Sequence, residues 1–166
     1  AVLVEAAALL AGSPIPFRFL LAGTGKLEPA LRLRIRDRSL GDTFRLIGHS
    51  DQITRLMPAF DMFAFPSLAG EGSPAVLKEA MACGIPIVAS RTSGVVEVVR
   101  DGREGLLVRP GDPEALRDAL LKFAADSNLA LECGRRGRDR ARDFSVGMMV
   151  ERTEAVYREL LEAGSS

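Results

Sequence analysis

DMFAFPSLAGEGSPAVLKEAMACGIPIVAS, residues 61–90, is the stretch that decides the fold. It opens and closes on short, mostly apolar runs, DMFAFP (61–66) and IPIVAS (85–90). Such runs are typical of strands that are buried on both faces, as in a parallel sheet whose crossover helices cover each side. The stretch therefore predicts two strands of a parallel sheet with a crossover between them.

The crossover itself carries the signals of a short helix near 74–83. Ser73 followed by Pro74 is an N-cap with proline at the first helical position, and Gly84 is the matching C-terminal signal. The helix is thus expected to be well bounded, with its N-terminus after a glycine-containing loop.

The same order of strand, turn and helix recurs on either side of this stretch. FRFLLA runs into the turn Gly23-Thr24-Gly25, and TFRLIG precedes a helical segment. The expected strands are 17–22, 43–48, 61–66, 85–90 and 105–108, and the expected helices in this part of the chain are 1–12, 27–38, 52–59 and 74–83. Alternation of this kind predicts a doubly wound α/β domain with a parallel sheet.

The C-terminal third is predicted to be helical. Asp112-Pro113-Glu114 is a strong helix start, with Asp112 as N-cap, and it opens a helix to about residue 125. Residues 129–142 and 146–162 are expected to form two further helices. At 166 residues the chain has the usual length of one domain.

Composition excludes several classes of protein. The 22 basic and 22 acidic residues give no net charge, which disfavours nucleic-acid binding through phosphates. Two distant cysteines and one histidine do not have the spacing of a structural zinc site. We find no apolar run long enough to span a membrane and no basic n-region of a signal peptide, so a soluble cytoplasmic protein with reduced thiols is expected.

The ligand edge of such a sheet lies beyond the carboxyl ends of the strands, where the loop 67–73 leads into the helix near 74–83. A helix N-terminus offers free N–H groups and a positive dipole end to a phosphate or a sugar hydroxyl. Glu71 precedes this N-terminus and Glu79 follows it. On these grounds alone the two carboxylates either bracket an anion site or serve as a helix-start charge and a solvated helix residue.

The pattern of the whole stretch favours the first interpretation, because it resembles the E-x7-E signature of retaining nucleotide-sugar glycosyltransferases of the GT-B fold, the glycosyl transferases group 1. Here the signature is Glu71 to Glu79, continued by EAMACGIPIVAS. The resemblance extends upstream to FRFLLAGTGKLE and downstream to SGVVEVVRDGREGLLVRPGDPEAL, and covers about residues 15–145. It implies a Rossmann-like, donor-binding C-terminal domain, one half of a GT-B fold.

The resemblance also implies residue roles. Glu71, the expected catalytic residue, lies by the transferred sugar, and Glu79 holds the ribose hydroxyls. The remaining donor-binding residues implied are those at the helix start and in two glycine turns: Gly72, Ser73, Pro74, Ala75 and Val76 for the sugar and diphosphate, Gly23 and Gly25 for the phosphate side, and Gly48 and His49 for the base. No Asp-x-Asp is present, so no metal and no cofactor are expected beside the nucleotide-sugar substrate.

The family's Gly-Arg strand and following lysine, which clamp the diphosphate, fall outside this chain. The domain 1–166 is therefore expected to lack its first strand and to be inactive alone, with the absent N-terminal domain as its partner. The terminal helix 146–162 is expected to cross to that domain. Membrane contact is expected to be peripheral at most, on the inner face, because acidic residues interrupt the arginines of 135–142 and favour a solvated helix.

Two alternatives remain open. One is the donor half of a GT-B sugar-nucleotide epimerase, and the other is a noncatalytic nucleotide-binding Rossmann-like module. Against a dinucleotide-binding domain, Gly23-Thr24-Gly25 is not followed by the third glycine of G-x-G-x-x-G.

Overall fold

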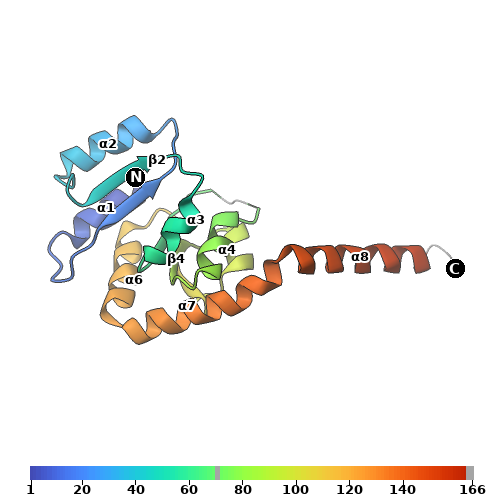
Figure 1. Cartoon of the computed structure of the whole chain (residues 1–166). Helices are drawn as coiled ribbons and strands as arrows, with labels where there is room; N and C mark the ends of the chain where they lie inside the picture. Colours follow the sequence, from blue (N-terminus) through green and yellow to red (C-terminus); the bar gives the residue numbers. More distant parts are fainter. Residues whose placement is uncertain (70–71, 164–166) are drawn as a thin grey trace.

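The computed structural model describes residues 1–69 and 72–163, which form an α/β domain from which one long helix extends (Figure 1). The strands are β1 (Phe19–Ala22), β2 (Phe44–Gly48), β3 (Phe63–Phe65), β4 (Ile87–Ser90) and β5 (Gly105–Val108). All their pairings are parallel. Each strand falls inside one of the expected apolar runs, so the predicted α/β class with parallel strands is confirmed.

The helices follow the expected order with one addition. They are α1 (Val2–Leu10), α2 (Glu28–Asp37), α3 (Ile53–Leu56), the 3-10 turn η1 (Met57–Ala59), α4 (Ala75–Ala82), α5 (Ser93–Val98), α6 (Pro113–Ala125), α7 (Ser127–Ala141), the 3-10 turn η2 (Arg142–Phe144) and α8 (Val146–Ala163). The addition is α5, which the sequence did not predict. The expected helix 52–59 is divided into α3 and η1 at Met57, one residue before Pro58.

Hydrogen bonding divides the strands into two ladders, β1–β2 and β3–β4–β5. In the larger one, β4 lies in the middle and all its residues are buried. Gly105 of β5 packs against it so closely that an added Cβ would lie 2.4 Å from the carbonyl oxygen of Ile87. Within the described residues, β1 pairs with β2 and β3 pairs with β4, so β1 and β3 each keep an edge without a strand partner.

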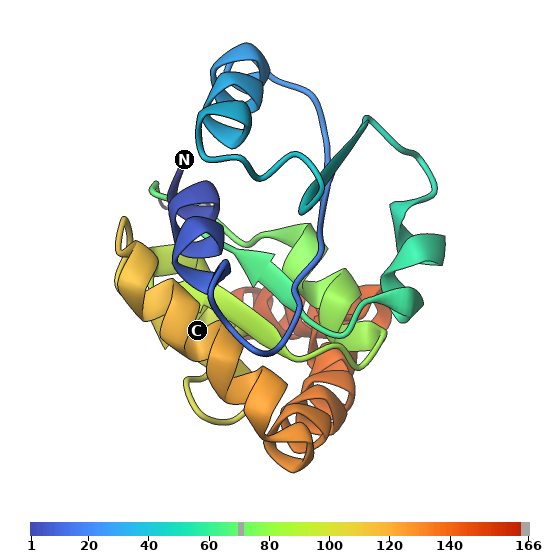
Figure 2. The ribbon, with the colours of Figure 1, turned by 90° about the vertical axis from the view of Figure 1, so that its left-hand side faces the viewer.

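Helices cover both faces of the strands. Figure 2 shows α1 beside α6, and these two helices share one hydrophobic core with strands β4 and β5. The opposite face of the larger ladder is covered by α4, α5 and η1, which contribute Leu77, Val95 and Met57 to a second core. Helix α1 also packs on the smaller ladder, where Val4 and Ala7 share a third core with Phe44. One helix thus joins the two ladders.

Local capping explains where the C-terminal helices begin. The Asp112 carboxylate accepts a 2.9 Å hydrogen bond from the Ala115 backbone N–H, which confirms the predicted N-cap of α6. Asp126 caps α7 in the same way through the N–H of Leu129. The two helices are therefore separated by a sharp turn and pack together at an angle, as Figure 1 shows.

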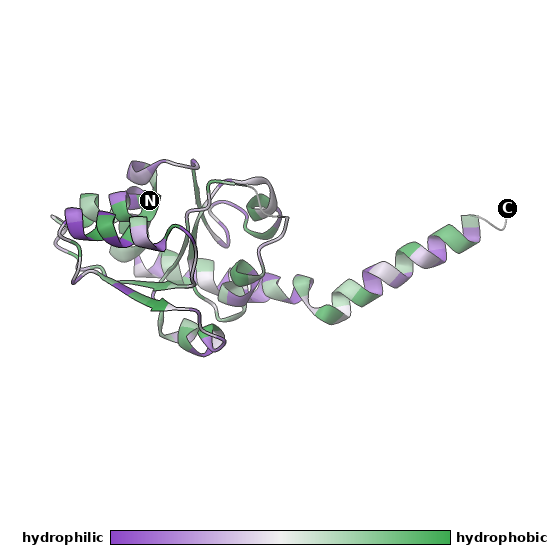
Figure 3. Cartoon of the chain, turned by 90° about the horizontal axis from the view of Figure 1, so that it is seen from above, coloured by the Kyte–Doolittle hydropathy of each residue, from purple (hydrophilic) through white to green (hydrophobic). Residues whose placement is uncertain are grey.

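Helix α8 extends away from the domain (Figures 1 and 3) and none of its described residues is buried. Apolar and polar residues alternate along it in Figure 3. Seven of its large apolar side chains are exposed by 45 to 73%, namely Val146, Met149, Val150, Val156, Tyr157, Leu160 and Leu161. Neither α8 nor any other helix among the described residues combines the length and the apolar character that a membrane span needs.

Candidate donor-binding site

The candidate site is built around the N-terminus of α4, at the carboxyl edge of β3. Ala75 is the first helical residue, and Pro74 precedes it with a ψ of 115°. No side-chain oxygen of the described residues caps this helix start. The prediction that Ser73 is the N-cap is therefore wrong, because the extended ψ of Pro74 makes the proline itself the capping position. The first N–H groups of α4 have no partner within the helix and none from a side chain of the described residues.

The other end of α4 is closed as the sequence predicted. Gly84 has a φ of +74°, and its N–H donates to the carbonyl of Met81, while the N–H of Ile85 donates to the carbonyl of Ala80. These two bonds form a Schellman motif, which satisfies the last carbonyls of the helix. The helix is thus tied down at its C-terminus and open at its N-terminus.

Glu79 lies in the second turn of α4 and is partly buried. Within the part of the chain that the structure describes, its carboxylate makes no hydrogen bond and no ion pair. The adjacent Lys78 lies over the ring of Phe144 instead. A carboxylate with two unused oxygens is suited to accept hydrogen bonds from a pair of hydroxyl groups. Glu71, the other carboxylate of the signature, lies outside the described residues.

Two of the glycine turns implied by the resemblance are brought together. The Gly23 N–H donates a 2.6 Å hydrogen bond to the carbonyl oxygen of Gly48, where the β1–β2 register shifts. Gly23 has a φ of +117° and Gly48 a φ of +70°, so both occupy conformations that favour glycine. The carbonyl of Gly25 accepts a hydrogen bond from the Glu28 N–H at the start of α2. These turns lie on the smaller ladder, whereas α4 follows the larger one.

His49 is exposed, and its Nε2 lies 2.8 Å from Oδ1 of Asp51. Its side chain thus has a local acidic partner and is not held by the protein core. Any contact of this turn with a base is therefore expected from the backbone around Gly48 more than from the imidazole.

Sequence reasoning missed two features near the carboxyl ends of β4 and β5. Thr92 follows β4, and its hydroxyl oxygen is buried without a hydrogen-bond partner in the described structure. Leu68, in the loop after β3, lies 3.7 Å from where a Cβ on Gly111 would stand, so the loops after β3 and β5 touch. No pattern in the sequence distinguishes either residue from an ordinary loop residue.

Two further kinds of site are relevant to ligand binding, a surface hollow and a metal site. A hollow of about 450 Å³ is lined by residues of α2 and β2, among them Arg32 and Arg36, and contains none of the expected site residues. Among residues 1–69 and 72–163 there is no group of histidine, cysteine or carboxylate side chains placed to hold a metal ion.

A family model described as glycosyl transferases group 1 matches residues 1–126. The chain belongs to this family. It is 35% identical over 138 residues to the putative colanic acid biosynthesis glycosyltransferase WcaL of Salmonella typhimurium, a match that covers 79% of this chain and 34% of the relative. It is 32% identical over 146 residues to the exopolysaccharide phosphotransferase SCO2592 of Streptomyces coelicolor, covering 87% of this chain and 16% of the relative.

The fold is that of a GT-B Rossmann-like domain. The crystal structure of Anabaena Alr3699/HepE in complex with UDP superposes with a TM-score of 0.87 at 25% identity and covers 95% of this chain and 44% of that one. The complex of the same protein with UDP-glucose gives a TM-score of 0.86 at 26% identity. This chain therefore spans less than half of the chain that it superposes on, and about a third or less of the two curated relatives.

Proposed function

We propose that this chain is the donor-binding domain of a retaining glycosyltransferase that moves a sugar from a nucleoside diphosphate sugar to an acceptor. The observation that carries the proposal is the open N-terminus of α4 together with the unpaired carboxylate of Glu79 in the same helix. The likeness to a protein crystallised with UDP and with UDP-glucose supports it.

The donor would lie across the N-terminus of α4. The N–H groups of Ser73, Ala75 and Val76 would meet the diphosphate and the sugar, with Gly72 and Pro74 shaping the approach, and Glu79 would hold the ribose hydroxyls. Gly23 and Gly25 would line the phosphate side, and the backbone at Gly48 and His49 would meet the base. Glu71 would lie by the transferred sugar.

The chemistry assigned to this half of the site is electrostatic. As the bond between the anomeric carbon and the diphosphate oxygen breaks, negative charge builds up on the leaving diphosphate and positive charge on the sugar ring. Fixed N–H dipoles at the helix start stabilise the departing charge without reorganisation, and a carboxylate stabilises the ring. We propose that no divalent metal takes part, since the helix N-terminus supplies the positive potential that a bridging metal supplies elsewhere.

The partner of this domain is proposed to be an N-terminal domain of the same polypeptide. The unpaired edges of β1 and β3 leave room in the ladder order for one more parallel strand. That strand would belong to this domain and precede α1, which would form the right-handed crossover from it to β1, so that the strand lies between β1 and β3.

The exposed apolar residues of α8, such as Met149 and Val156, would pack on the N-terminal domain.

The test is to incubate the full-length polypeptide with UDP-, GDP- and ADP-sugars and a panel of acceptors, and to follow the products by NMR. Transfer with the anomeric configuration unchanged supports the proposal. Inversion at the anomeric carbon contradicts the retaining mechanism, and a new nucleotide sugar formed without acceptor indicates an epimerase. Binding without any reaction indicates a noncatalytic module. The cytoplasmic location and the absence of nucleic-acid binding stay predictions.

A further inference from the structure

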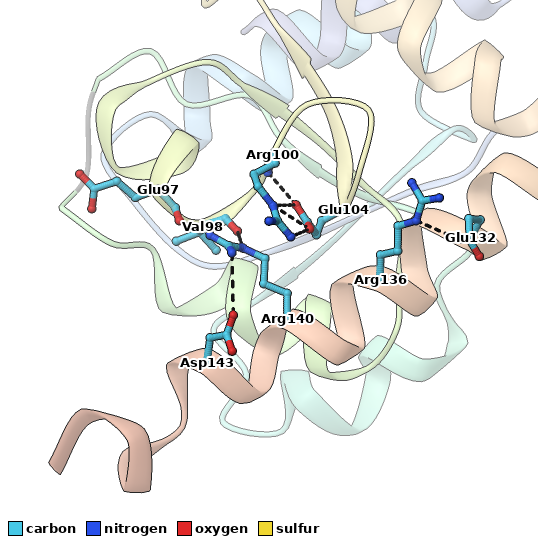
Figure 4. A network of polar contacts seen from close by, with 8 residues as sticks. All are labelled: Glu97, Val98, Arg100, Glu104, Glu132, Arg136, Arg140 and Asp143. Carbon is cyan, nitrogen blue, oxygen red and sulfur yellow. Dashed lines mark hydrogen bonds and ion pairs between the residues drawn. The ribbon is translucent and has the colours of Figure 1, made fainter. Parts of the chain in front are cut away.

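The arginines of α7 are not all solvated. Arg135 and Arg136 pair with Glu132 of the same helix, as expected for a surface, and the Arg136 pair appears in Figure 4. Arg138, in contrast, donates a 2.9 Å hydrogen bond from Nη2 to the carbonyl oxygen of Cys83 at the end of α4. Arg138 is exposed, as a solvated face predicts, but its guanidinium also reaches a different helix.

Arg140 makes the equivalent contact with α5. Its Nε donates to the carbonyl of Val98 at 2.9 Å and its Nη2 to the carbonyl of Glu97 at 2.8 Å, as Figure 4 shows. Its side chain is 19% exposed and lies over the ring of Phe144. A cation at a helix C-terminus is favoured by the helix dipole as well as by the hydrogen bonds. Helix α7 thus caps the C-termini of two helices that begin at the carboxyl edge of the sheet.

The contact between α7 and α4 is close as well as polar. Gly134 and Gly137 are both buried in it. A Cβ on Gly134 would lie 2.1 Å from the carbonyl oxygen of Gly84, and one on Gly137 would lie 3.6 Å from Cγ of Met81. Gly84 itself is covered by the Arg138 guanidinium, because an added Cβ there would lie 2.6 Å from Nη2. The turn that ends α4 is therefore held between Gly134 and Arg138, which lie one helical turn apart on α7.

Resting on the proposed function, we infer that α7 fixes the axial position of α4, with Arg138 and Gly134 as positioning residues for the donor site. Helix α4 has only 8 residues, so its two ends are about 12 Å apart at 1.5 Å per residue. A shift of the C-terminal end of α4, which Gly134 and Arg138 contact, moves the N–H groups at its N-terminus by the same amount. Neither residue touches the donor; both act through α4.

The test compares Arg138→Ala with Arg135→Ala in the full-length polypeptide. Arg135 is the matched control, because it lies on the same helix, is 63% exposed and pairs with Glu132 and Asp139 of α7. Calorimetry with UDP, GDP and ADP measures nucleotide affinity at a temperature where circular dichroism shows every variant folded. We expect Arg138→Ala to weaken binding about five- to tenfold and Arg135→Ala to stay within about twofold of the parent. Arg138→Lys, which keeps the charge, should fall between them.

Binding of Arg138→Ala within about twofold of the parent, or an equal loss in Arg135→Ala, overturns the inference. If UDP, GDP and ADP all fail to bind the parent, the proposed function fails and the role in the donor site fails with it; amide hydrogen exchange then decides whether α7 fixes α4 through Arg138. Faster exchange of residues 79–85 in Arg138→Ala than in Arg135→Ala supports the inference that α7 holds the C-terminal turn of α4 in place. Equal exchange in the two variants contradicts it. If Arg138→Ala does not fold, Arg138→Lys is judged by the same two measurements.

Discussion

The backbone N–H of Gly23 donates to the carbonyl oxygen of Gly48 at 2.6 Å, so the turns that follow β1 and β2 form one unit. Both glycines have positive φ, and nothing lies within 4 Å of where a Cβ would stand on either. The preference for glycine at these two positions thus comes from the backbone conformation and not from a lack of space for a side chain. A side chain at either position has room but not the backbone that it prefers.

Gly48→Ala is therefore expected to lower the free energy of unfolding by about 1 to 2 kcal/mol, the cost of a left-handed backbone for a residue with a Cβ. Gly25→Ala is the control, because the φ of Gly25 is not positive and nothing lies within 4 Å of where its Cβ would stand. Urea denaturation of the full-length variants measures the difference. Equal stability of Gly48→Ala and Gly25→Ala would show that the turn relaxes.

Glu79→Gln is expected to weaken nucleotide binding by about 1.5 to 3 kcal/mol, because the amide replaces a charged acceptor of ribose hydroxyl bonds. Glu114→Gln, at an exposed position in the first turn of α6, should leave the affinity unchanged. Titration calorimetry with UDP, GDP and ADP gives the comparison. Unchanged affinity in Glu79→Gln would remove this residue from the ribose site.

Donor binding is expected to persist after treatment with a chelator. The described residues hold no carboxylate or histidine group placed for a metal, and the N–H groups of α4 offer the anion its partners. The affinity for UDP-, GDP- and ADP-sugars, measured before and after addition of EDTA, checks this expectation. A marked loss that magnesium or manganese restores would count against it.

Acid should destabilise the domain through Glu104. This carboxylate is 1% exposed; burial works against its ionisation, but the guanidinium and backbone N–H of Arg100 hold the pKa of Glu104 below its usual value of 4.5 (Figure 4). A lowered pKa in the folded state means that the ion pair stabilises the fold above about pH 4.5 and that this contribution is lost as the pH falls through the folded-state pKa.

Glu104→Gln should therefore lower the free energy of unfolding at pH 7 by about 1 to 3 kcal/mol and flatten its pH dependence below pH 4.5. Glu154→Gln is the control, since this carboxylate is 58% exposed and pairs with Arg158 within a single helix. Urea denaturation at pH 3, 4, 5 and 7 separates the two. An unchanged pH dependence in Glu104→Gln would show that the pair contributes little.

Much of the fold follows from the sequence because its signals are local. Asp112 before Pro113 fixes the start of α6, and Gly84 fixes the end of α4, each through one hydrogen-bonding pattern. Helix α5 was not predictable, because it has only 6 residues, with a glycine and three valines that favour other structures. Burial of Val95 and Val98 and the hydrogen bonds from Arg140 make it helical, and these partners lie far away in the sequence.

The candidate site was predicted at the level of its elements and less well in detail. Helix α4 and the position of Glu79 in it are as expected, whereas the helix begins at Ala75 with Pro74, and not Ser73, at the capping position. The partners of Arg138 and Arg140 could not be inferred either. A run of arginines interrupted by aspartates has the same pattern whether its side chains face solvent or the carbonyls of neighbouring helices.

The central claim is that a nucleoside diphosphate sugar binds at the N-terminus of α4. The most direct test is an NMR titration of the isotopically labelled full-length polypeptide with UDP-, GDP- and ADP-sugars, followed at the backbone amides. The account predicts that one of these donors binds in the micromolar range and shifts the amides of residues 72, 73 and 75–79, together with those of Gly23, Gly25 and Gly48. Shifts confined to the hollow beside α2, or no shift with any donor at millimolar concentration, would contradict it.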